Sequence, residues 1–422
     1  MTKGDGRPYV VSSTPEGGIG ERPDLAPLDY YGDPLTAHDL IPLPDGATLS
    51  MLPGRLAQGV DAIGEIQQVN ESDGWALAAL LPIGYTRTHL PAYTLAHAGE
   101  FLPLFGYTAV AGYRGRLYVA AIRTDNPERW LSRNFDPARL QRSVESLTAR
   151  FPENRIIRQH AHCTLDYHCP TASNLFLVRW EGAIAVSGGC NARCVGCISK
   201  QEEDGIVSAQ DRLPFVPTVE EIAEVAIHHL RTAPDAIISF GQGCEGEPLL
   251  QAGLIERAIK AIRAETDKGV LNINTNASHP HALERLFRAG LDMIRASTIS
   301  ARTETYNAYY RPVGYTFEHV KRSLQIAAEH GVFSSINLLS FPGLVDAEVE
   351  VEALIRFVRE THLRRIQIRN LNIDPEQLFA RVSRPDGPYL GVKHMIDVLR
   401  RELPEVEIGN FSRPVQRVSR PA

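Results

Sequence analysis

The second half of the chain alternates short apolar runs with amphipathic stretches, and this alternation restricts the fold more than any other feature. Six apolar runs of strand length follow Gly182: Ala183–Val186, Ala236–Phe240, Val270–Asn274, Met293–Ala296, Ser334–Leu339 and Arg365–Ile368. Strand–helix units in series favour a parallel sheet with right-handed crossovers. Six units are fewer than a closed eightfold barrel needs, so the sequence predicts an α/β fold with a partial (β/α)6 barrel.

The stretches between these runs carry apolar residues at helical spacing. The first of them opens with a capping box, because Thr218 is followed three residues later by Glu221. We predict further helices at Leu249–Glu265, His281–Ala289, Phe317–Glu329, Glu348–Glu360 and Val392–Glu402. Gly290 and Gly331 stand where helices commonly end. Since parallel sheets bind ligands at the carboxyl ends of their strands, the chemistry should lie just after each apolar run.

The cysteines of the chain are confined to one window. All six fall between positions 163 and 244 of a 422-residue sequence: Cys163, Cys169, Cys190, Cys194, Cys197 and Cys244. Disulfide-rich secreted proteins are small and carry cysteines throughout, so this clustering predicts a metal site instead. The net charge of −6 does not call for nucleic acid. We find neither a signal peptide nor an apolar run of membrane-spanning length, and we expect a cytoplasmic protein with no membrane partner.

Three of these cysteines lie in one loop after the first predicted strand. Cys190, Cys194 and Cys197 have the spacing C-x3-C-x2-C. A cubane iron–sulfur cluster is usually held by four thiolates, so three would leave one iron open to a second molecule. The alternative is a zinc site of three cysteines and one histidine, but zinc ligands usually come as two separated pairs. The spacing therefore favours an iron–sulfur cluster.

The second predicted strand is followed by Gly246-Glu247-Pro248. Glycine allows a ligand to approach the backbone closely, and a carboxylate accepts a charge-assisted hydrogen bond from an ammonium group. The same three residues also suit a turn before a helix that has proline at its first position. On its own this motif is weak evidence, and it gains weight from its place after the second strand.

Together these motifs resemble those of radical S-adenosylmethionine (SAM) enzymes. The resemblance implies that three thiolates hold a [4Fe–4S] cluster and that SAM chelates the fourth iron. It also implies that Gly246, Glu247 and Pro248 receive the methionine end of SAM. Electron transfer would then cleave SAM to methionine and a 5′-deoxyadenosyl radical. This chain departs from the family in one place, because Gly196 stands where the family usually has an aromatic residue.

The later strands resemble the family as well, over roughly residues 182–374. The third ends in Thr275-Asn276-Ala277, which is similar to the family's Thr-Asn-Gly ending. The resemblance makes Asn276, Ser297 after the fourth strand and Asn337 at the end of the fifth candidates for contacts to SAM. Each of these polar residues also suits a helix cap or a turn.

Cys163, Cys169 and Cys244 admit three interpretations. They could ligate a second iron–sulfur cluster, with His162, His168 or the substrate as a fourth ligand. Cys244 could be a catalytic thiol that donates hydrogen or forms a thioether. All three could also be buried and inert, which is common for free cysteines.

We divide the chain into four parts: an N-terminal accessory domain (1–150), a cysteine-containing linker (151–181), a radical SAM core barrel (182–375) and a C-terminal extension (376–422). The accessory domain is predicted to be α+β. Its strand-like runs include Trp75–Leu81, Thr108–Ala111 and Leu117–Ile122, and a hairpin turn is predicted at Gly112-Tyr113-Arg114-Gly115.

The resemblance implies an enzyme that takes electrons from a low-potential donor such as flavodoxin or ferredoxin. Its substrate is not readable from the sequence. We favour a peptide or protein, because the remaining cysteines resemble those of peptide-modifying and maturase members. The alternatives are an RNA methyltransferase, since Gly246-Glu247-Pro248 resembles the motif of rRNA-methylating members, and a non-enzymatic iron–sulfur or zinc redox sensor.

Overall fold

The computed structural model describes residues 6–14, 16–70, 72, 74–97, 100–200, 205–242 and 245–415. The chain forms two compact units, and each is assembled from separate stretches of sequence. The first unit comprises Met1–Leu131, Ser340–Val351 and Arg369–Leu399. The second comprises Ser132–Leu339, Glu352–Ile368 and Arg400–Ala422.

The first unit is built on an eight-stranded antiparallel sheet with the order β2-β1-β8-β11-β12-β4, in which β5 pairs with β8 and β9 with β12. Its strands are β1 (Tyr9–Ser13), β2 (Ile19–Arg22), β4 (Leu40–Pro42), β5 (Thr48–Leu52), β8 (Trp75–Leu80), β9 (Tyr85–Arg87), β11 (Thr108–Tyr113) and β12 (Arg116–Arg123). The predicted hairpin is confirmed, because Tyr113 pairs with Arg116 across Arg114 and Gly115. Both turn residues have positive φ, as such turns require.

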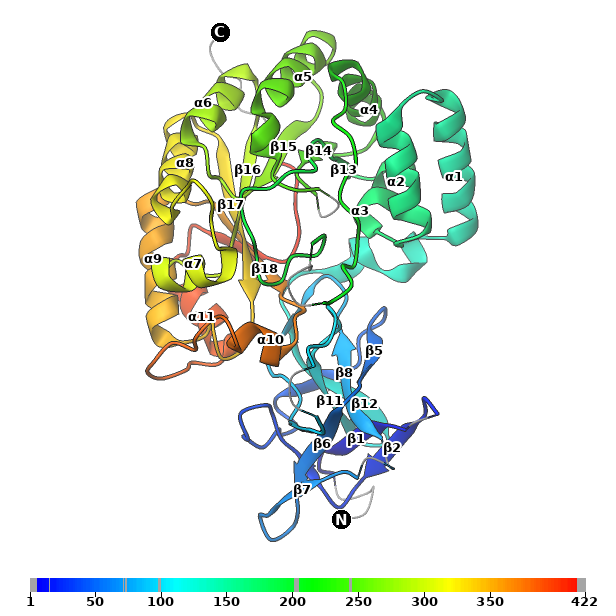
Figure 1. Ribbon diagram of the computed structural model, residues 1–422, viewed down its shortest axis with the longest axis vertical. Coiled ribbons are helices and arrows are strands. Elements are labelled where there is room, and N and C mark those ends of the chain that lie inside the picture. Colours follow the sequence, from blue (N-terminus) through cyan, green and yellow to red (C-terminus); the bar gives the residue numbers. More distant parts are fainter. Residues whose placement is uncertain are drawn as a thin grey trace. The chain divides into compact units, whose positions relative to one another are not determined.

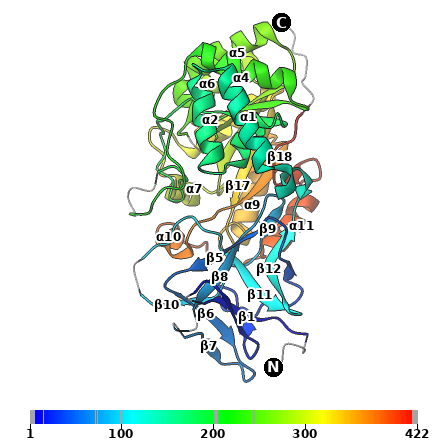
Figure 2. The ribbon, with the colours of Figure 1, turned by 90° about the vertical axis from the view of Figure 1, so that its right-hand side faces the viewer.

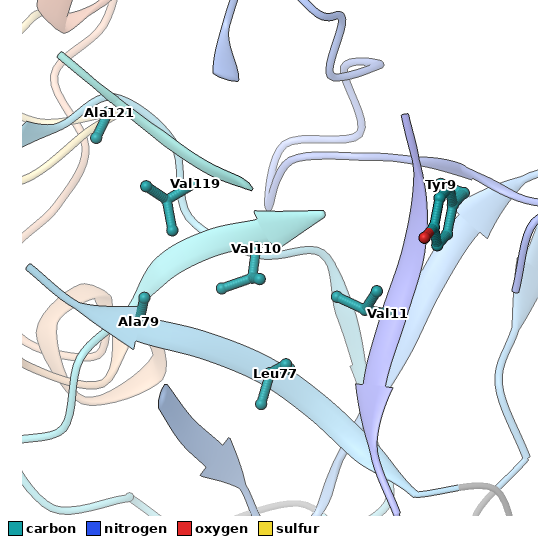
Figure 3. Close-up of a cluster of buried hydrophobic side chains, with 7 residues drawn as sticks. All are labelled: Tyr9, Val11, Leu77, Ala79, Val110, Val119 and Ala121. Carbon is teal, nitrogen blue, oxygen red and sulfur yellow. The ribbon is translucent and has the colours of Figure 1, made fainter. Parts of the chain in front are cut away.

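One face of this sheet is a compact apolar core (Figure 3). The side chains that form it come from four strands: Tyr9, Val11, Leu77, Ala79, Val110, Val119 and Ala121. A smaller sheet has the order β10-β6-β3, with β7 paired to β6. Its strands are β3 (Ala26–Pro27), β6 (Arg55–Val60), β7 (Ile66–Gln68) and β10 (Tyr93–Leu95). The α-helices of this unit come from its C-terminal stretches and include α10 (Pro375–Phe379) and most of α11 (Val392–Glu402).

The second unit contains a seven-stranded sheet whose strands stand in chain order, β13-β14-β15-β16-β17-β18-β19 (Figure 1). The paired strands for which the register is known run parallel. The strands are β13 (Glu181–Ile184), β14 (Ile237–Phe240), β15 (Val270–Thr275), β16 (Met293–Thr298), β17 (Phe333–Ser340), β18 (Arg365–Asn370) and β19 (Glu407–Gly409). The six predicted strands are therefore present, with β13 starting two residues earlier than expected. The seventh, β19, was not predicted, since three residues give no periodic signal.

Helices connect these strands and flank the sheet (Figures 1 and 2). They are α1 (Pro137–Arg150), α2 (Arg155–Leu165), α3 (Pro170–Phe176), α4 (Val219–Thr232), α5 (Ala252–Glu265), α6 (Pro280–Ala289), α7 (Thr303–Tyr310), α8 (Phe317–Glu329) and α9 (Glu348–Thr361), which begins in the first unit. The predicted capping box of Thr218 and Glu221 forms at the start of α4. Figure 2 shows α1 and α2 side by side, and α2 also packs on α4.

The two faces of the parallel sheet differ sharply in polarity. One set of alternate positions is apolar, including Ile238, Phe240 and Ile294. The other set is polar, and hydrogen bonds connect its members across strands. Ser239 Oγ donates to Glu181 Oε1 at 2.7 Å, and Arg295 Nη2 donates to the same oxygen at 3.3 Å. This polar face is where the second unit can receive a polar ligand.

The structure contains no helix, in the part of the chain that it describes, with the length and apolar character needed to cross a membrane.

Candidate functional site

The loop that carries three cysteines follows β13 and is hydrogen-bonded to the Gly246-Glu247-Pro248 segment. The Gly246 N–H donates to the Ser187 carbonyl oxygen and the Glu247 N–H to that of Gly189, both at 2.7 Å. A Cβ at position 246 would lie 1.8 Å from the Gly189 oxygen. Only glycine fits here, so the sequence motif reflects close packing of the two loops.

The end of helix α7 holds the same loop at further points. The N–H groups of Arg193 and Val195 donate to the carbonyl oxygens of Tyr310 at 2.9 Å and Tyr309 at 3.0 Å. The side chain of Arg311 donates through Nε to the carbonyl oxygen of Arg193 at 2.5 Å. The cysteine loop is thus fixed along its backbone although it contains no regular secondary structure. The sequence analysis did not predict this anchoring role for α7.

The three thiols lie in one electrostatic environment. Burial raises the pKa of Cys190 and of Cys194, and at Cys194 the neighbouring Cys197 and Cys190 raise it further. Burial also acts to raise the pKa of Cys197, but hydrogen bonds from Ser199 and Arg212 outweigh it and the pKa falls below its ordinary value. The loop therefore gathers three mutually interacting sulfur atoms and supplies hydrogen-bond donors to one of them.

Glu247 is buried and ties the ends of two strands together. Its carboxylate accepts hydrogen bonds from the Leu249 N–H at 2.9 Å, the Asn276 N–H at 2.8 Å and the Thr275 hydroxyl. Burial raises the pKa of Glu247 to about 7, and the three hydrogen bonds oppose that rise. A carboxylate has about four lone-pair positions, so one remains for a ligand.

Asn276 makes a second tie, between the end of β15 and the cysteine loop. Its Nδ2 donates to Asn191 Oδ1 at 2.7 Å, and Asn191 Nδ2 donates to Ser278 Oγ at 3.0 Å. The backbone N–H of Ser278 donates back to Asn276 Oδ1 at 3.0 Å, which closes a ring of three residues. Asn191 and Ser278 were not predicted as functional residues, because only the folded loops bring them together.

Ser297 and Asn337 occupy paired positions on β16 and β17, so the structure brings these two predicted residues together. Both are partly buried on the polar face of the sheet. Asn337 Oδ1 is buried and has no hydrogen-bond partner within the described residues. A buried acceptor of this kind needs an explanation, and a ligand or an ordered water supplies one.

Glu245 is a site residue that the sequence analysis missed. Its carboxylate accepts four backbone hydrogen bonds, from the N–H groups of Val186 and Ser187 after β13 and of Gly241 and Gln242 after β14. Burial raises its pKa to about 8, against the effect of these four bonds. The carboxylate fixes the carboxyl ends of two neighbouring strands. The only signal in the sequence is an acidic residue inside a glycine-rich loop.

Residues 184–355 match the family model of the Radical SAM superfamily. The match spans less than half of the chain and supports membership of this superfamily. A curated GTP 3′,8-cyclase of Microcystis aeruginosa (strain NIES-843 / IAM M-2473) is 29% identical over 193 residues, which are 44% of this chain and 54% of that protein. The match thus covers about half of the relative's length. Both similarities indicate an enzyme of the radical SAM class.

Solved structures resemble the chain more loosely. Streptococcus suis SuiB bound to its precursor peptide SuiA is 13% identical, covers 61% of this chain and 53% of its own, and has a TM-score of 0.40. A radical SAM methyltransferase from Sphaerobacter thermophilus is 15% identical, covers 55% and 65%, and has a TM-score of 0.38. Neither superposition is close enough to support an inference about substrate.

The superfamily implies a [4Fe–4S] cluster and SAM as cofactors, and the donor set fits a cluster. No three His, Cys, Asp or Glu side chains among the described residues converge closely enough to hold a single metal ion. A cubane does not require such convergence, because thiolates bound to separate irons stand farther apart than the ligands of one ion. Cys190, Cys194 and Cys197 are the residues that would hold the cluster.

Two of the remaining cysteines lie in one apolar cluster. Cys163 and Cys169 pack with Ala172, Ala185 and Leu213. The Cys169 N–H donates to the Cys163 carbonyl oxygen at 3.0 Å, and burial raises the pKa of Cys169. These surroundings favour packing over cluster binding for both thiols. Cys244 lies outside the described residues, so its predicted catalytic role stays a prediction.

Proposed function

We propose that this protein reductively cleaves SAM at a [4Fe–4S] cluster held by Cys190, Cys194 and Cys197, and that it uses the resulting 5′-deoxyadenosyl radical to modify a peptide or protein. The observation that carries the proposal is the packing of the cysteine loop directly against Gly246 and Glu247. That packing sets the loop that carries the three cysteines against a glycine backbone and a buried carboxylate, which supports joint binding of a cluster and SAM.

The chain's own residues have separable roles in this proposal. Glu245 and Glu247 hold the ends of β13, β14 and β15 in place through backbone hydrogen bonds. The remaining lone pair of Glu247 would accept a hydrogen bond from the methionine ammonium group. Ser297 and Asn337 would form hydrogen bonds to the ribose or carboxylate of SAM. The seven-stranded sheet would curve as a partial barrel around these groups.

The proposal also covers the domain division, the electron donor and the cellular location. We retain the division into an accessory domain (1–150), a linker (151–181), a core (182–375) and an extension (376–422). A radical SAM enzyme needs a reductant, and we propose flavodoxin or ferredoxin. Because the cytoplasm keeps thiols reduced, we also propose a cytoplasmic location.

A second candidate substrate is a small nucleotide. It is favoured by the 29% identity to a GTP 3′,8-cyclase, whose name states its substrate. The two candidates differ in what they require of the protein. A nucleotide must bind directly, so GTP should protect the protein against thermal unfolding, and the protection should grow with the logarithm of the GTP concentration above its dissociation constant. Absence of such protection from a cluster-loaded enzyme would leave the peptide or protein candidate.

The test of the proposed function combines metal content with SAM cleavage. The protein would be purified and reconstituted without oxygen, its iron and sulfide counted, and 5′-deoxyadenosine measured after addition of dithionite and SAM. The Cys190→Ala/Cys194→Ala/Cys197→Ala variant should lose iron and activity. The matched control is Cys163→Ala/Cys169→Ala, which also removes thiols but should retain both.

Each outcome of this experiment has a definite meaning. About four irons per chain with 5′-deoxyadenosine supports a single-cluster radical enzyme. About eight irons, falling to about four in the triple variant, would show a second cluster. Zinc alone, or an intact cluster that never cleaves SAM, would overturn the enzyme proposal and favour a redox sensor.

A further inference from the structure

Arg212 lies on a segment that returns to the cysteine loop after the third cysteine. The Gln210 N–H donates to the Ile198 carbonyl oxygen at 3.2 Å. A Cβ at position 188 would lie only 2.5 Å from the Leu213 carbonyl oxygen, so the segment also packs on the start of the cysteine loop. These two contacts fix the backbone on both sides of Arg212.

The Arg212 guanidinium reaches the third cysteine directly. Its Nη2 donates to Cys197 Sγ at 3.5 Å, and its Nε donates to Ser199 Oγ at 3.1 Å. Ser199 Oγ in turn lies 3.6 Å from the same sulfur. The two side chains form a fork around Cys197 Sγ, with a charged donor on one branch and a hydroxyl on the other.

The charge of Arg212 also acts on the other two thiols. Burial is the largest influence on Cys190 and on Cys194 and raises the pKa of both, while Arg212 opposes the rise at each. Arg212 therefore lies close enough to stabilise negative charge on all three proposed cluster ligands. Arg193, which is in the cysteine loop itself, is exposed and therefore suits a control.

We propose that Arg212 is a positioning residue that raises the reduction potential of the iron–sulfur cluster, through its hydrogen bond to the Cys197 sulfur and through its charge. This inference rests on the proposed function of the cysteine loop. It adds a role for a residue that contributes no ligand and that the cluster motif does not include.

The electrostatic reason is simple. Reduction transfers one electron from the low-potential donor to the cluster, so [4Fe–4S]2+ becomes [4Fe–4S]+ with no bond broken and no proton required. The cluster with its thiolates gains one negative charge in this step. A nearby cation and an N–H···S hydrogen bond stabilise the more negative state, and hydrogen bonds to the sulfurs and net charge are known determinants of cluster potentials. Arg212 thus makes the cluster easier to reduce.

The experiment is a redox titration of the reconstituted full-length protein without SAM, followed by the electron paramagnetic resonance signal of the reduced cluster. Arg212→Gln should lower the ratio of reduced to oxidised cluster at a fixed potential by about tenfold, which for a one-electron couple is a midpoint about 59 mV more negative. Arg212→Lys keeps the charge without the fork and should fall between. Arg193→Gln removes the same charge from the same loop and should leave the midpoint near that of the wild type.

Iron content separates the two proposals. If the wild-type protein binds no cluster, the proposed function fails and this inference fails with it. If every variant holds about four irons and Arg212→Gln has the wild-type midpoint, the inference alone is overturned. Equal shifts in Arg212→Gln and Arg193→Gln would overturn it too, because the effect would then be net charge only.

A second variant covers the case in which Arg212→Gln loses its cluster. Ser199→Ala removes one branch of the fork and leaves the charge in place. It should shift the midpoint in the same direction as Arg212→Lys and by less than the full tenfold change. Wild-type midpoints in both Ser199→Ala and Arg212→Lys would overturn the inference.

Discussion

Some buried amide atoms on the polar face of the parallel sheet have no hydrogen-bond partner among the described residues. Gln367 has a relative exposure of 0%, and neither its Nε2 nor its Oε1 forms a hydrogen bond within the described part of the chain. The arginine two residues before it, Arg365, lies over the Phe333 ring at 4.8 Å. Alternate residues of β18 therefore share a face with Phe333 and Asn337. Within the described part of the second unit, the buried amide atoms of Gln367 and Asn337 Oδ1 are therefore available to bind a ligand or water.

This arrangement predicts that Gln367→Met makes the ligand-free protein more stable. A buried polar group without a partner costs about 1–3 kcal/mol, and methionine has a similar volume and no polar requirement. We expect the free energy of unfolding to rise by about 1 kcal/mol, measured by denaturant titration. Gln58→Met is the control, because Gln58 Nε2 donates to Thr94 Oγ1 at 2.7 Å. If both variants are destabilised alike, water satisfies the Gln367 amide.

At the scale of single elements, helix α3 ends in a conformation that its sequence does not favour. The Arg179 N–H donates to the Asn174 carbonyl oxygen at 2.8 Å and the Val178 N–H to that of Leu175 at 3.3 Å. This is the Schellman pattern, which needs a left-handed residue just past the helix. That residue is Val178, with φ of 53°. Valine is among the least suited residues for this conformation.

Val178→Gly should therefore stabilise the protein. Relief of the left-handed strain is worth roughly 1–2 kcal/mol, and the added flexibility of glycine in the unfolded chain costs roughly 0.5–1 kcal/mol. The expected gain of about 1 kcal/mol would be measured by thermal unfolding. Val207→Gly is the matched control, since that exposed valine is not among the residues with positive φ and should show no gain.

Helices α2 and α4 are joined by one carboxylate. Glu221 accepts hydrogen bonds from Arg155 through Nε at 2.8 Å and Nη2 at 2.7 Å, and its Oε2 also accepts the Thr218 N–H at 2.8 Å. The hydrogen bonds from Arg155 are the main cause that lowers the pKa of Glu221 to about 2. Because the unfolded chain has the ordinary, higher value, the native state favours the ionised form. The Arg155–Glu221 ion pair thus stabilises the fold only while the Glu221 carboxylate is charged.

Glu221→Gln should make this contribution visible as a pH dependence. The Glu221 side chain is only 13% exposed, but its partner Arg155 is 38% exposed and solvent screens the pair, so we expect wild type to exceed the variant by only about 1 kcal/mol near pH 6. The difference should shrink as the pH falls below the ordinary glutamate value of about 4.3 and vanish towards pH 2. Parallel denaturant titrations at several pH values would measure it. A difference that stays constant over that range, or that matches the exposed Glu405→Gln control, would contradict this account.

At the scale of the whole molecule, the sequence predicts the second unit well and the first poorly. The strands β13 to β18 and the helices α8 and α11 are recoverable because periodic apolar patterns of adequate length encode them. The cysteine loop is recoverable because cluster chemistry fixes residue type and spacing. The ring of Asn191, Asn276 and Ser278 is not, since it depends on loop conformations. Nor does local sequence show that the stretches 340–351 and 369–399 complete the first unit.

A buried ion pair joins the stretch 369–399 to the N-terminal stretch within the first unit. Arg55 Nη2 lies 2.6 Å from Asp374 Oδ2, and the side chains are only 1% and 0% exposed. Asp374 also accepts the Leu102 N–H at 2.8 Å. Breaking a buried pair leaves an uncompensated charge, so Asp374→Asn should destabilise the protein by about 3–5 kcal/mol in thermal or denaturant unfolding. The exposed pair Arg22–Asp24 is the control, where Asp24→Asn should cost less than about 1 kcal/mol.

The outcome that would contradict this prediction is a small effect of Asp374→Asn, comparable to that of the surface control. The double variant Arg55→Met/Asp374→Leu provides a further check, because removing both charges should recover most of the loss.

The same ion pair bears on how the chain folds as it is made. Arg55 and Asp374 are 319 residues apart. At synthesis rates of about 5–20 residues per second, the ribosome needs about 16–64 s to produce the partner after Arg55 has appeared. The strands of the parallel sheet, by contrast, emerge in the order in which they pair. The first part of the chain to be synthesised is therefore among the last to finish folding, and during that interval its unfinished strands are an expected target for chaperones.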